Sequence, residues 1–394
     1  MRLKAKWLVL LTAIMFVLAL AATGCGGSGD KKEGEKKAAG ADDKTVKIGI
    51  LAPLTGDVKT FGESTINGAK LAVEQTGGKI GDLKIELVTA DDRNDPTEAV
   101  NVATKLISQD KVSGIVGSVT SKTTIPISKL ANDNKVVLVT GTATNEKVTV
   151  DEGKRKEFVF RACFIDPFQG KVAAKFALDN LKKKTAAVLY DQSNDYTIGL
   201  ANNFKENFTK GGGQITDFLA YGKDDTDFSA VLTNIAKKNP DILYLPDYYQ
   251  KVSLIGKQAR SKGVNAVFLG GDGWDSSELD YKTMDGGYFT NHYSADDPSP
   301  QVKKFVQDYK AKYGKTPDAL AALAYDACSL LLNAVKTANG KDPAKIKDAL
   351  QATKDFQTVS GKITFDKDGN PIKAATILQA KADGKQAFVA TVSP

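Results

Sequence analysis

Reactive side chains are scarce in this 394-residue chain. It contains three cysteines, at Cys25, Cys163 and Cys328, and a single histidine, His292. A lone histidine without a cysteine or carboxylate partner at ligand spacing argues against a zinc site and against a nucleophile triad. The sequence has no G-x-S-x-G motif, and Gly314-Lys315-Thr316 lacks the earlier glycine of a phosphate-binding loop. These absences predict that the chain is not an enzyme and holds no metal or cofactor.

So few cysteines also exclude a disulfide framework. Cys328 lies within an apolar helical pattern, Ala319–Ala338, which predicts a small buried side chain. The sequence leaves open whether Cys163 and Cys328 form a single bridge.

A basic stripe is absent as well. The net charge of +7 comes from 54 basic and 47 acidic residues, and the lysines are interleaved with acids, as in Lys154-Arg155-Lys156-Glu157. This pattern predicts a solvated surface and no nucleic-acid partner. Hydrophobic residues make up 42% of the chain, as in soluble globular proteins, and the length suits two lobes of roughly 150 to 200 residues.

One uncharged apolar run stands at the amino terminus. It covers Trp7–Ala22 and follows a basic start at residues 2–6. About 16 residues fall short of the ~20 that span a bilayer. The next residues, Ala22-Thr23-Gly24-Cys25, resemble a bacterial lipobox, although Ala22 stands where leucine is usual. We therefore expect residues 1–24 to be a lipoprotein signal peptide, with lipid on Cys25 tying the chain to the cell membrane. An uncleaved anchor is the alternative, and it also leaves the remainder outside the cytoplasm.

The segment after Cys25 has no aromatic or β-branched residue until Thr45. Such a composition cannot bury enough apolar surface to fold, so residues 25–44 are expected to be a flexible tether.

From Val46 onward, short apolar runs alternate with amphipathic helical stretches. Near-continuous apolar runs are typical of parallel strands covered on both faces. One helix, Pro96–Gln109, is marked by Asp95 as its cap and by Glu98 three residues later. Repeated strand–helix alternation predicts a doubly wound α/β architecture. The predicted strands are Val46–Ala52, Leu83–Ala90, Val112–Gly117, Val136–Thr140, Ala186–Tyr190, Ile215–Ala220, Ile242–Pro246 and Val267–Gly270.

The end of the chain departs from this alternation. Two long helical patterns, Val302–Tyr313 and Asp318–Ala338, have no strand between them. We then expect a hairpin of Gly361–Asp366 and Ala374–Ala380, turning at Asp368-Gly369-Asn370. Such a tail predicts that the chain recrosses between the lobes.

Several short motifs, in this order and spacing, resemble the type I periplasmic binding proteins of the Leu/Ile/Val-binding family. The resemblance covers nearly the whole chain after the tether. The motifs are Ile48–Gly56, Phe61-Gly62, Asn67-Gly68-Ala69, Asp91-Asp92 with Asp95-Pro96, Gly117–Ser121 with Pro126, Thr142–Asn145, Tyr190-Asp191 with Tyr196–Gly199, and Gly270–Trp274.

The resemblance implies two doubly wound parallel-sheet lobes joined by a three-segment hinge. With boundaries near Cys163, Ala295 and Thr358, the N-terminal lobe comprises 45–163 plus 296–357, and the C-terminal lobe comprises 164–295 plus 358–394. The resemblance also implies that the chain is the substrate-binding component of an ABC transporter. Such a protein is expected to be a monomer that captures a branched-chain or related amino acid and delivers it to the permease subunits.

A free amino acid carries a carboxylate and an ammonium on one carbon, and burying either charge unpaired is costly. Its site must therefore offer donors on one side and acceptors on the other. Hydroxyl-rich loops follow two predicted strands, where ligands of open α/β sheets bind. By resemblance, Ser121 and the backbone at Thr144 bind the carboxylate, and Ala143 is a further ligand-binding residue of the same loop. The Thr142 carbonyl and the Thr144 hydroxyl receive the ammonium.

From the second lobe, the resemblance implies that Asp272 pairs with the ammonium and that Tyr248 contacts the carboxylate. Tyr249 is the alternative to Tyr248. The aromatic candidates for the side-chain pocket are Phe61, Tyr196 and Trp274.

Simpler roles exist for the same residues. Serine and threonine often cap helices, and Asp272 could serve only as a turn aspartate in a glycine-rich loop. The acids Asp91, Asp92 and Asp95 suit a strand-to-helix turn better than a calcium site. Alternative functions are a binding protein for an amide, urea or aromatic acid, or a sensory receptor for such a solute.

Overall fold

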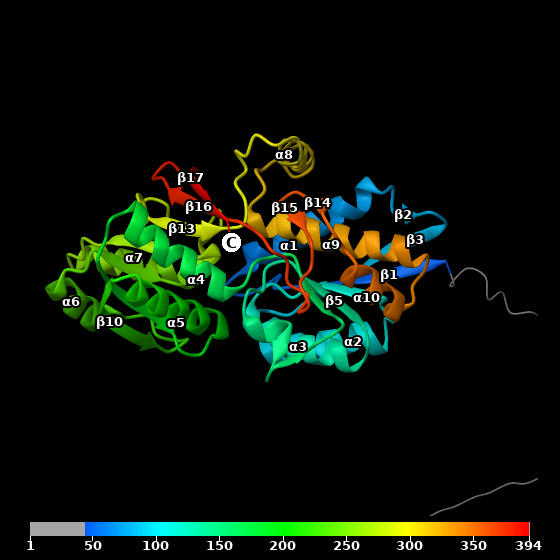
Figure 1. Cartoon of the computed structure of the whole chain (residues 1–394), viewed down its shortest axis with the longest axis horizontal. Coiled ribbons are helices and arrows are strands. Elements are labelled where there is room, and N and C mark those ends of the chain that lie inside the picture. Colours follow the sequence, from blue (N-terminus) through cyan, green and yellow to red (C-terminus); the bar gives the residue numbers. More distant parts are fainter. Residues whose placement is uncertain (1–43, 394) are drawn as a thin grey trace, which may run out of the picture. The chain divides into compact units, whose positions relative to one another are not determined.

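The computed structural model describes residues 44–393 and contains two large β-sheets (Figure 1). The expected signal peptide, the lipidation site at Cys25 and nearly all of the tether lie outside the described residues.

The first sheet has six strands in the order β2-β3-β1-β4-β5-β8, and β1 pairs in parallel with both β3 and β4. We call this sheet and the helices that cover it the first lobe. Its strands are β1 (Thr45–Ala52), β2 (Lys79–Ile80), β3 (Leu83–Asp91), β4 (Gly114–Gly117), β5 (Val137–Thr140) and β8 (Val159–Arg161). Its helices are α1 (Lys59–Gln75), α2 (Pro96–Ser108), α3 (Ser121–Asp133), α8 (Pro300–Tyr313), α9 (Ala319–Ala338) and α10 (Pro343–Gln351).

Both faces of this sheet are buried. Ile48 and Ile50 of β1 belong to the hydrophobic cluster that includes α1 and α9, while Leu51 belongs to the cluster built on α2 and α3. This double burial explains why the strands read as continuous apolar runs.

The second sheet has seven strands in the order β10-β9-β11-β12-β13-β16-β17. Strands β9, β10, β11, β12 and β13 are parallel, whereas β16 and β17 are antiparallel to their neighbours. This sheet and its helices form the second lobe. The strands are β9 (Thr185–Asp191), β10 (Gln214–Tyr221), β11 (Ile242–Leu245), β12 (Val267–Gly270), β13 (Tyr288–Asn291), β16 (Ala375–Ala380) and β17 (Gln386–Val392). The helices are α4 (Asp166–Lys175), α5 (Asp195–Lys210), α6 (Ser229–Lys238) and α7 (Tyr249–Ser261).

The chain passes between the two sheets three times. It leaves the first sheet between β8 and α4, returns between β13 and α8, and leaves again before β16. The boundaries predicted near Cys163 and Ala295 fall inside the first two connections. The third crossing comes later than Thr358, because the small hairpin of β14 (Phe356–Thr358) and β15 (Gly361–Ile363) packs beside α9.

All eight predicted strands are present, which confirms the α/β architecture. The predicted helix start is also confirmed, since the Asp95 carboxylate accepts hydrogen bonds from Thr97 N and Glu98 N, both at 2.9 Å. Cys163 and Cys328 are both buried and both free, so no bridge joins them.

The predicted turn at Asp368-Gly369-Asn370 is present, since Asp366 N donates to the Asn370 carbonyl at 2.8 Å, but the predicted pairing of its two flanking strands is wrong. Gly361–Ile363 pairs with Phe356–Thr358, and Ala375–Ala380 pairs with β13 and β17. Local turn residues suggested one pairing, but β16 gains partners on both sides by joining the second sheet.

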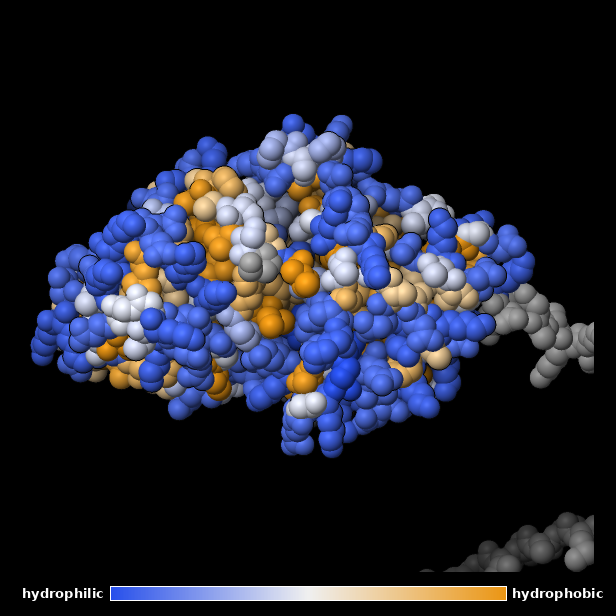
Figure 2. All heavy atoms as spheres, in the orientation of Figure 1, coloured by the Kyte–Doolittle hydropathy of each residue, from blue (hydrophilic) through white to orange (hydrophobic). Residues whose placement is uncertain are grey.

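Helix α9 is the one described helix that is long and apolar enough to cross a membrane, and 78% of its apolar window is buried inside the protein. The face shown in Figure 2 is mostly hydrophilic, with apolar atoms gathered near β17. Phe388 and Val389 of that edge strand are exposed.

Helices α1 and α9 lie side by side although about 250 residues separate parts of them (Figure 1). Gly68 permits this approach, because a Cβ at that position would lie 2.1 Å from the Ala321 carbonyl oxygen. We therefore expect Gly68→Ala to lower the free energy of unfolding by about 1–3 kcal/mol, the usual cost of overpacking.

At an unhindered glycine in a helix, substitution by alanine instead raises the free energy of unfolding by roughly 0.5–1 kcal/mol. Urea unfolding measures the change, and Lys70→Ala on the exposed face of α1 is the control. A stabilised Gly68→Ala variant contradicts the packing argument.

Candidate functional site

A small cavity lies between the two lobes. Its volume is about 20 Å³, enough for roughly one water molecule. The first lobe supplies one wall and the second lobe the other. The lining residues are Phe61, Val119, Thr120, Ser121, Thr142, Leu320, Tyr196, Tyr248, Asp272 and Gly273.

The first-lobe wall is built at the carboxyl ends of β4 and β5. Ser121 begins helix α3, and its N-cap Thr120 makes no side-chain capping bond. The Thr142 hydroxyl donates to the Val119 carbonyl at 2.8 Å, which ties the loop after β5 to the loop after β4. The wall therefore presents hydroxyls and the amino end of a helix, where free backbone N–H groups favour anions.

The loop after β5 is held from behind by Arg161. This buried guanidinium donates to the carbonyls of Ala143 at 2.8 Å and Asn145 at 2.9 Å. Asn145 N in turn donates to Ser121 Oγ at 3.2 Å. These bonds fix the path of the loop, because each would leave a buried polar group unpaired if the backbone moved.

The second-lobe wall is centred on Asp272, in a short turn after β12. Its Oδ1 accepts hydrogen bonds from Gln169 Nε2 and the Tyr196 hydroxyl, both at 2.8 Å. Its Oδ2 lies 3.1 Å from His292 Nε2. The side chain is 9% exposed, so the second wall presents a buried acidic acceptor.

Three aromatic rings close the cavity. Tyr196 and Tyr248 stack with centroids 5.2 Å apart and planes 3° from parallel. Phe61, from the first lobe, meets Tyr248 edge-on at 5.8 Å. The edge-on contact therefore joins the stacked pair of the second lobe to the first lobe.

The lobes also touch around the rim of the cavity. Asn145 Nδ2 donates to the Asp195 carbonyl at 2.9 Å, and Lys147 Nζ lies 2.9 Å from Asp195 Oδ1. Elsewhere on the rim, the Thr60 and Ser276 hydroxyls are 3.0 Å apart. The described conformation is therefore a closed one.

Six residues predicted from the sequence line this cavity together. They are Phe61, Ser121, Thr142, Tyr196, Tyr248 and Asp272. Tyr249 does not line it and packs in the core against Phe61.

Ala143, Thr144 and Trp274 are fully or almost fully buried but do not line the cavity. Trp274 packs in the second-lobe core, and its indole N–H donates to the Leu245 carbonyl at 3.0 Å.

Leu320, which reaches the cavity from the start of α9, is not predicted from the sequence. Gln169 and His292, which hold Asp272, are not predicted either. No local signal marks these residues, because each looks like ordinary core. The placement of Leu320 follows only from the packing of α9 against α1.

A second carboxyl group, Asp166, lies behind the cavity at the start of α4. It is 1% exposed, and Asn145 Nδ2 donates to its Oδ2 at 3.2 Å. Burial raises the pKa of Asp166 to about 8, and the nearby charge of Asp272 adds to the effect. Asp166 is therefore expected to be mostly protonated at neutral pH.

The titratable side chains around the cavity indicate neither metal binding nor nucleophilic catalysis. Within residues 44–393, no cluster of three or more His, Cys, Asp or Glu side chains could hold a metal ion. Burial raises the pKa of the Cys163 thiol to about 12, so it is not a ready nucleophile. What the two walls can do is pair a positive and a negative group of one small solute.

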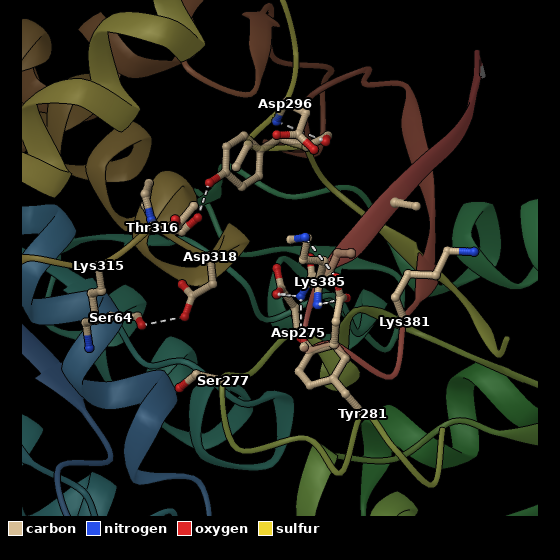
Figure 3. Close-up of a pocket in the computed structure, with 18 of the residues that line it drawn as sticks. Ser64, Asp275, Ser277, Tyr281, Asp296, Lys315, Thr316, Asp318, Lys381 and Lys385 are labelled. Atoms are coloured by element: carbon tan, nitrogen blue, oxygen red, sulfur yellow. Dashed lines mark hydrogen bonds and ion pairs between the residues drawn. The ribbon is translucent and has the colours of Figure 1, made fainter. Parts of the chain in front are cut away.

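A larger cavity of about 880 Å³ lies beside the start of α9 (Figure 3). Burial, together with the negative charge of Asp275, raises the pKa of Asp318 to about 7. The Ser64 hydroxyl donates to Asp318 at 2.6 Å, while Gln386 Nε2 and Ala319 N donate to Asp275 at 2.6 and 2.8 Å. None of the predicted binding residues lines this cavity, and its inner carboxylates already have protein donors. We therefore assign the candidate site to the smaller cavity.

Comparison with known proteins gives a consistent result. Residues 45–385 match the family model described as periplasmic binding protein. The leucine-, isoleucine-, valine-, threonine- and alanine-binding protein of Pseudomonas aeruginosa is 31% identical over 331 residues, covering 83% of this chain and 87% of that protein.

Solved structures are similar over the same region. A leucine-binding protein from Thermotoga maritima has a TM-score of 0.84 and 40% identity, covering 89% of this chain and 99% of its own. A branched-chain amino acid transporter substrate-binding protein from Streptococcus pneumoniae, in complex with isoleucine, has a TM-score of 0.83 and 34% identity, covering 89% and 100%. The predicted two-lobe fold class is thereby confirmed.

The raised pKa of Asp166 predicts a pH dependence of stability. Between about pH 4 and about pH 8 the folded chain holds a proton on Asp166 that the unfolded chain releases. The unfolded state then binds fewer protons, so this group makes stability fall as the pH rises through that window. We expect Asp166→Asn to reduce the fall in thermal midpoint between about pH 5 and about pH 8.

Thermal unfolding at the two pH values measures the effect, with Asp224→Asn at an exposed position as the control. An Asp166→Asn variant that keeps the full wild-type pH dependence, as the control should, contradicts the assignment.

Proposed function

Because this chain belongs to the periplasmic binding protein family, we propose that it is the extracytoplasmic substrate-binding component of an ABC transporter and captures a branched-chain amino acid between its lobes. The proposal includes delivery of that amino acid to the permease subunits, with no catalytic step.

The opposite polarity of the two cavity walls carries this proposal. The first-lobe wall offers donors at the start of α3, whereas the second-lobe wall offers the Asp272 carboxylate. A zwitterion satisfies both walls at once, and a solute with only one charge leaves the other wall unpaired.

In this proposal the ligand carboxylate binds the amino end of α3 through Ser121, with Tyr248 beside it. The ammonium binds Asp272 and the Thr142 carbonyl, whereas Thr144 is fully buried behind the cavity. The helix dipole favours the carboxylate at that end.

The apolar side of the cavity favours an aliphatic ligand side chain. This apolar side is formed by Phe61, Leu320 and the Tyr196–Tyr248 stack. One methylene changes affinity by only about 1–3 kcal/mol in such a lining, so leucine, isoleucine and valine are expected to compete closely. The relatives named for these amino acids support the same class.

Entry of the ligand requires the lobes to separate. A cavity of about 20 Å³ is too small for an amino acid, and both lobes wall it in. We propose that the open form exposes each wall, and that the ligand favours closure by the contacts it makes to both.

Family membership puts the chain outside the cytoplasm. We further propose that residues 1–24 are removed, that Cys25 carries the lipid anchor, and that residues 25–44 tether a monomer near its permease. We propose lobe boundaries near Cys163 and Ala295; the third boundary follows Ile363 instead of Thr358, because β15 pairs with β14 beside α9. A tether raises the effective concentration of the binding protein at the permease.

A ligand screen tests the proposed function. Protein lacking residues 1–41, the remainder of which is one compact unit, is unfolded and refolded to remove bound solute. It is then screened by thermal shift and calorimetry against the twenty amino acids, urea, short amides and aromatic acids. Ligand at a thousandfold its Kd stabilises the native state by about 4 kcal/mol. A response confined to amides or aromatic acids contradicts the proposed ligand class.

Asp272→Asn should weaken binding of leucine by at least about a hundredfold, because removing one partner of a buried ion pair costs about 3–5 kcal/mol. Calorimetry measures the Kd. Asp280→Asn, a part-buried carboxylate of the same lobe that bonds Thr283, is the matched control. Unchanged affinity in Asp272→Asn contradicts the ammonium assignment.

Lys147→Ala should weaken leucine binding by no more than about fivefold, because the Lys147–Asp195 pair joins the closed lobes at an exposed position. The effect should shrink at high salt, since exposed charges are then screened. Lys129→Ala breaks a similar pair with Asp133 inside α3 and serves as the control. Equal losses in both variants contradict a role in closure.

A further inference from the structure

Asp272 is held by side chains from three different parts of the second lobe. Gln169 comes from α4, Tyr196 from α5, and His292 from the connection after β13. Oδ1 accepts two of these hydrogen bonds and Oδ2 accepts one. A carboxylate oxygen has two lone-pair sites, so Oδ2 keeps one for a further donor.

His292 is itself tightly fixed. Its ring stacks on Phe164 with centroids 3.8 Å apart, and its backbone N–H donates to Asn291 Oδ1 at 2.8 Å. The side chain is 1% exposed, and its Nδ1 has no hydrogen-bond partner among the described residues. The imidazole therefore directs one nitrogen, Nε2, at Asp272 and donates its single N–H there.

We infer that His292 is a positioning residue for ligand binding: it fixes the Asp272 carboxylate so that the free lone pair of Oδ2 faces the amino group of the solute. The inference rests on the proposed function, since it assumes that Asp272 receives an ammonium. His292 lies on the second connection between the lobes, so the hinge itself carries the group that orients Asp272.

The charge state of the ring matters for this role. Burial lowers the pKa of His292, although the contact with Asp272 opposes the effect. The ring is therefore neutral at neutral pH and does not compete with an ammonium for Asp272. The other charged groups that act on it are Asp275 and Lys373.

Further titratable groups stand near Asp272. Burial raises the pKa of the Tyr196 hydroxyl, which donates to Asp272, and that of the Tyr248 hydroxyl well above their usual value. The Cys163 thiol has a pKa raised to about 12, and burial raises the pKa of Asp166 to about 8. All four groups are uncharged at neutral pH, so His292 is the neighbour whose protonation would place a positive charge against Asp272.

A double-mutant cycle tests the inference. Leucine affinity is measured by calorimetry for the protein lacking residues 1–41, for His292→Leu, for Asp272→Asn and for the double variant. His292→Leu should weaken binding about tenfold or more, because a hydrogen bond to a charged group is lost. In the Asp272→Asn background the same change should alter affinity by less than about twofold. Equal losses in both backgrounds mean a merely structural role and overturn the inference.

Two conservative variants keep the test valid if His292→Leu does not fold. His292→Gln can place an amide N–H near the Nε2 position and should bind leucine within about threefold of wild type. His292→Asn is too short to do so and should bind about tenfold more weakly. Equal affinities of the two variants overturn the inference.

Nuclear magnetic resonance of the ring separates this inference from the proposed function, because the chain has one histidine and its ring signals need no assignment. Without ligand, the ring should be the neutral Nε2–H tautomer, and Asp272→Asn should lower its pKa further. Leucine should also lower that pKa, since it brings a positive charge to the same carboxylate. Ring signals indifferent to Asp272→Asn overturn the inference, whereas a wild-type protein that binds no amino acid refutes the proposed function alone.

Discussion

The carboxylate of Asp272 lies almost buried between two lobes, and within residues 44–393 its one ion-pair partner is the ring of His292. That ring is neutral at neutral pH because burial lowers its pKa. Hydrogen bonds from Gln169 and Tyr196 orient the charge but do not neutralise it. A buried charge without a counterion is costly, and an ammonium from outside removes that cost. The selectivity and the closing motion that we propose both depend on this unmet charge.

The fold brings that charge to a complementary surface. Parallel strands in each lobe end at the cleft, so the loop after β5 and the turn after β12 face each other. Close packing of α1 on α9 at Gly68 sets Phe61 and Leu320 on the first-lobe wall. The buried Arg161 holds the loop that carries Thr142. Each lobe is rigid and the hinge allows them to move together, so the ligand is bound from both sides. The binding contacts are complete only when the lobes meet.

Much of this organisation is visible in the sequence. The strands can be predicted because burial on both faces demands continuous apolar runs, and helix α2 because Asp95 and Pro96 mark its start. Six cavity residues follow from strand ends combined with the family motifs. Other features depend on long-range packing. Nothing local to Leu320 or His292 indicates a cleft, and β16 takes its partners from the second sheet instead of from the nearest turn.

The single measurement that tests the account most directly is a crystal structure of the refolded protein with isoleucine. The account predicts isoleucine between lobes that close around it, in a cavity wider than the one of about 20 Å³ in the described conformation. Its ammonium lies on Asp272 Oδ2 and its carboxylate at the amino end of α3. An isoleucine bound in the reverse orientation contradicts the account, as does one bound in the larger cavity beside Asp275 and Asp318.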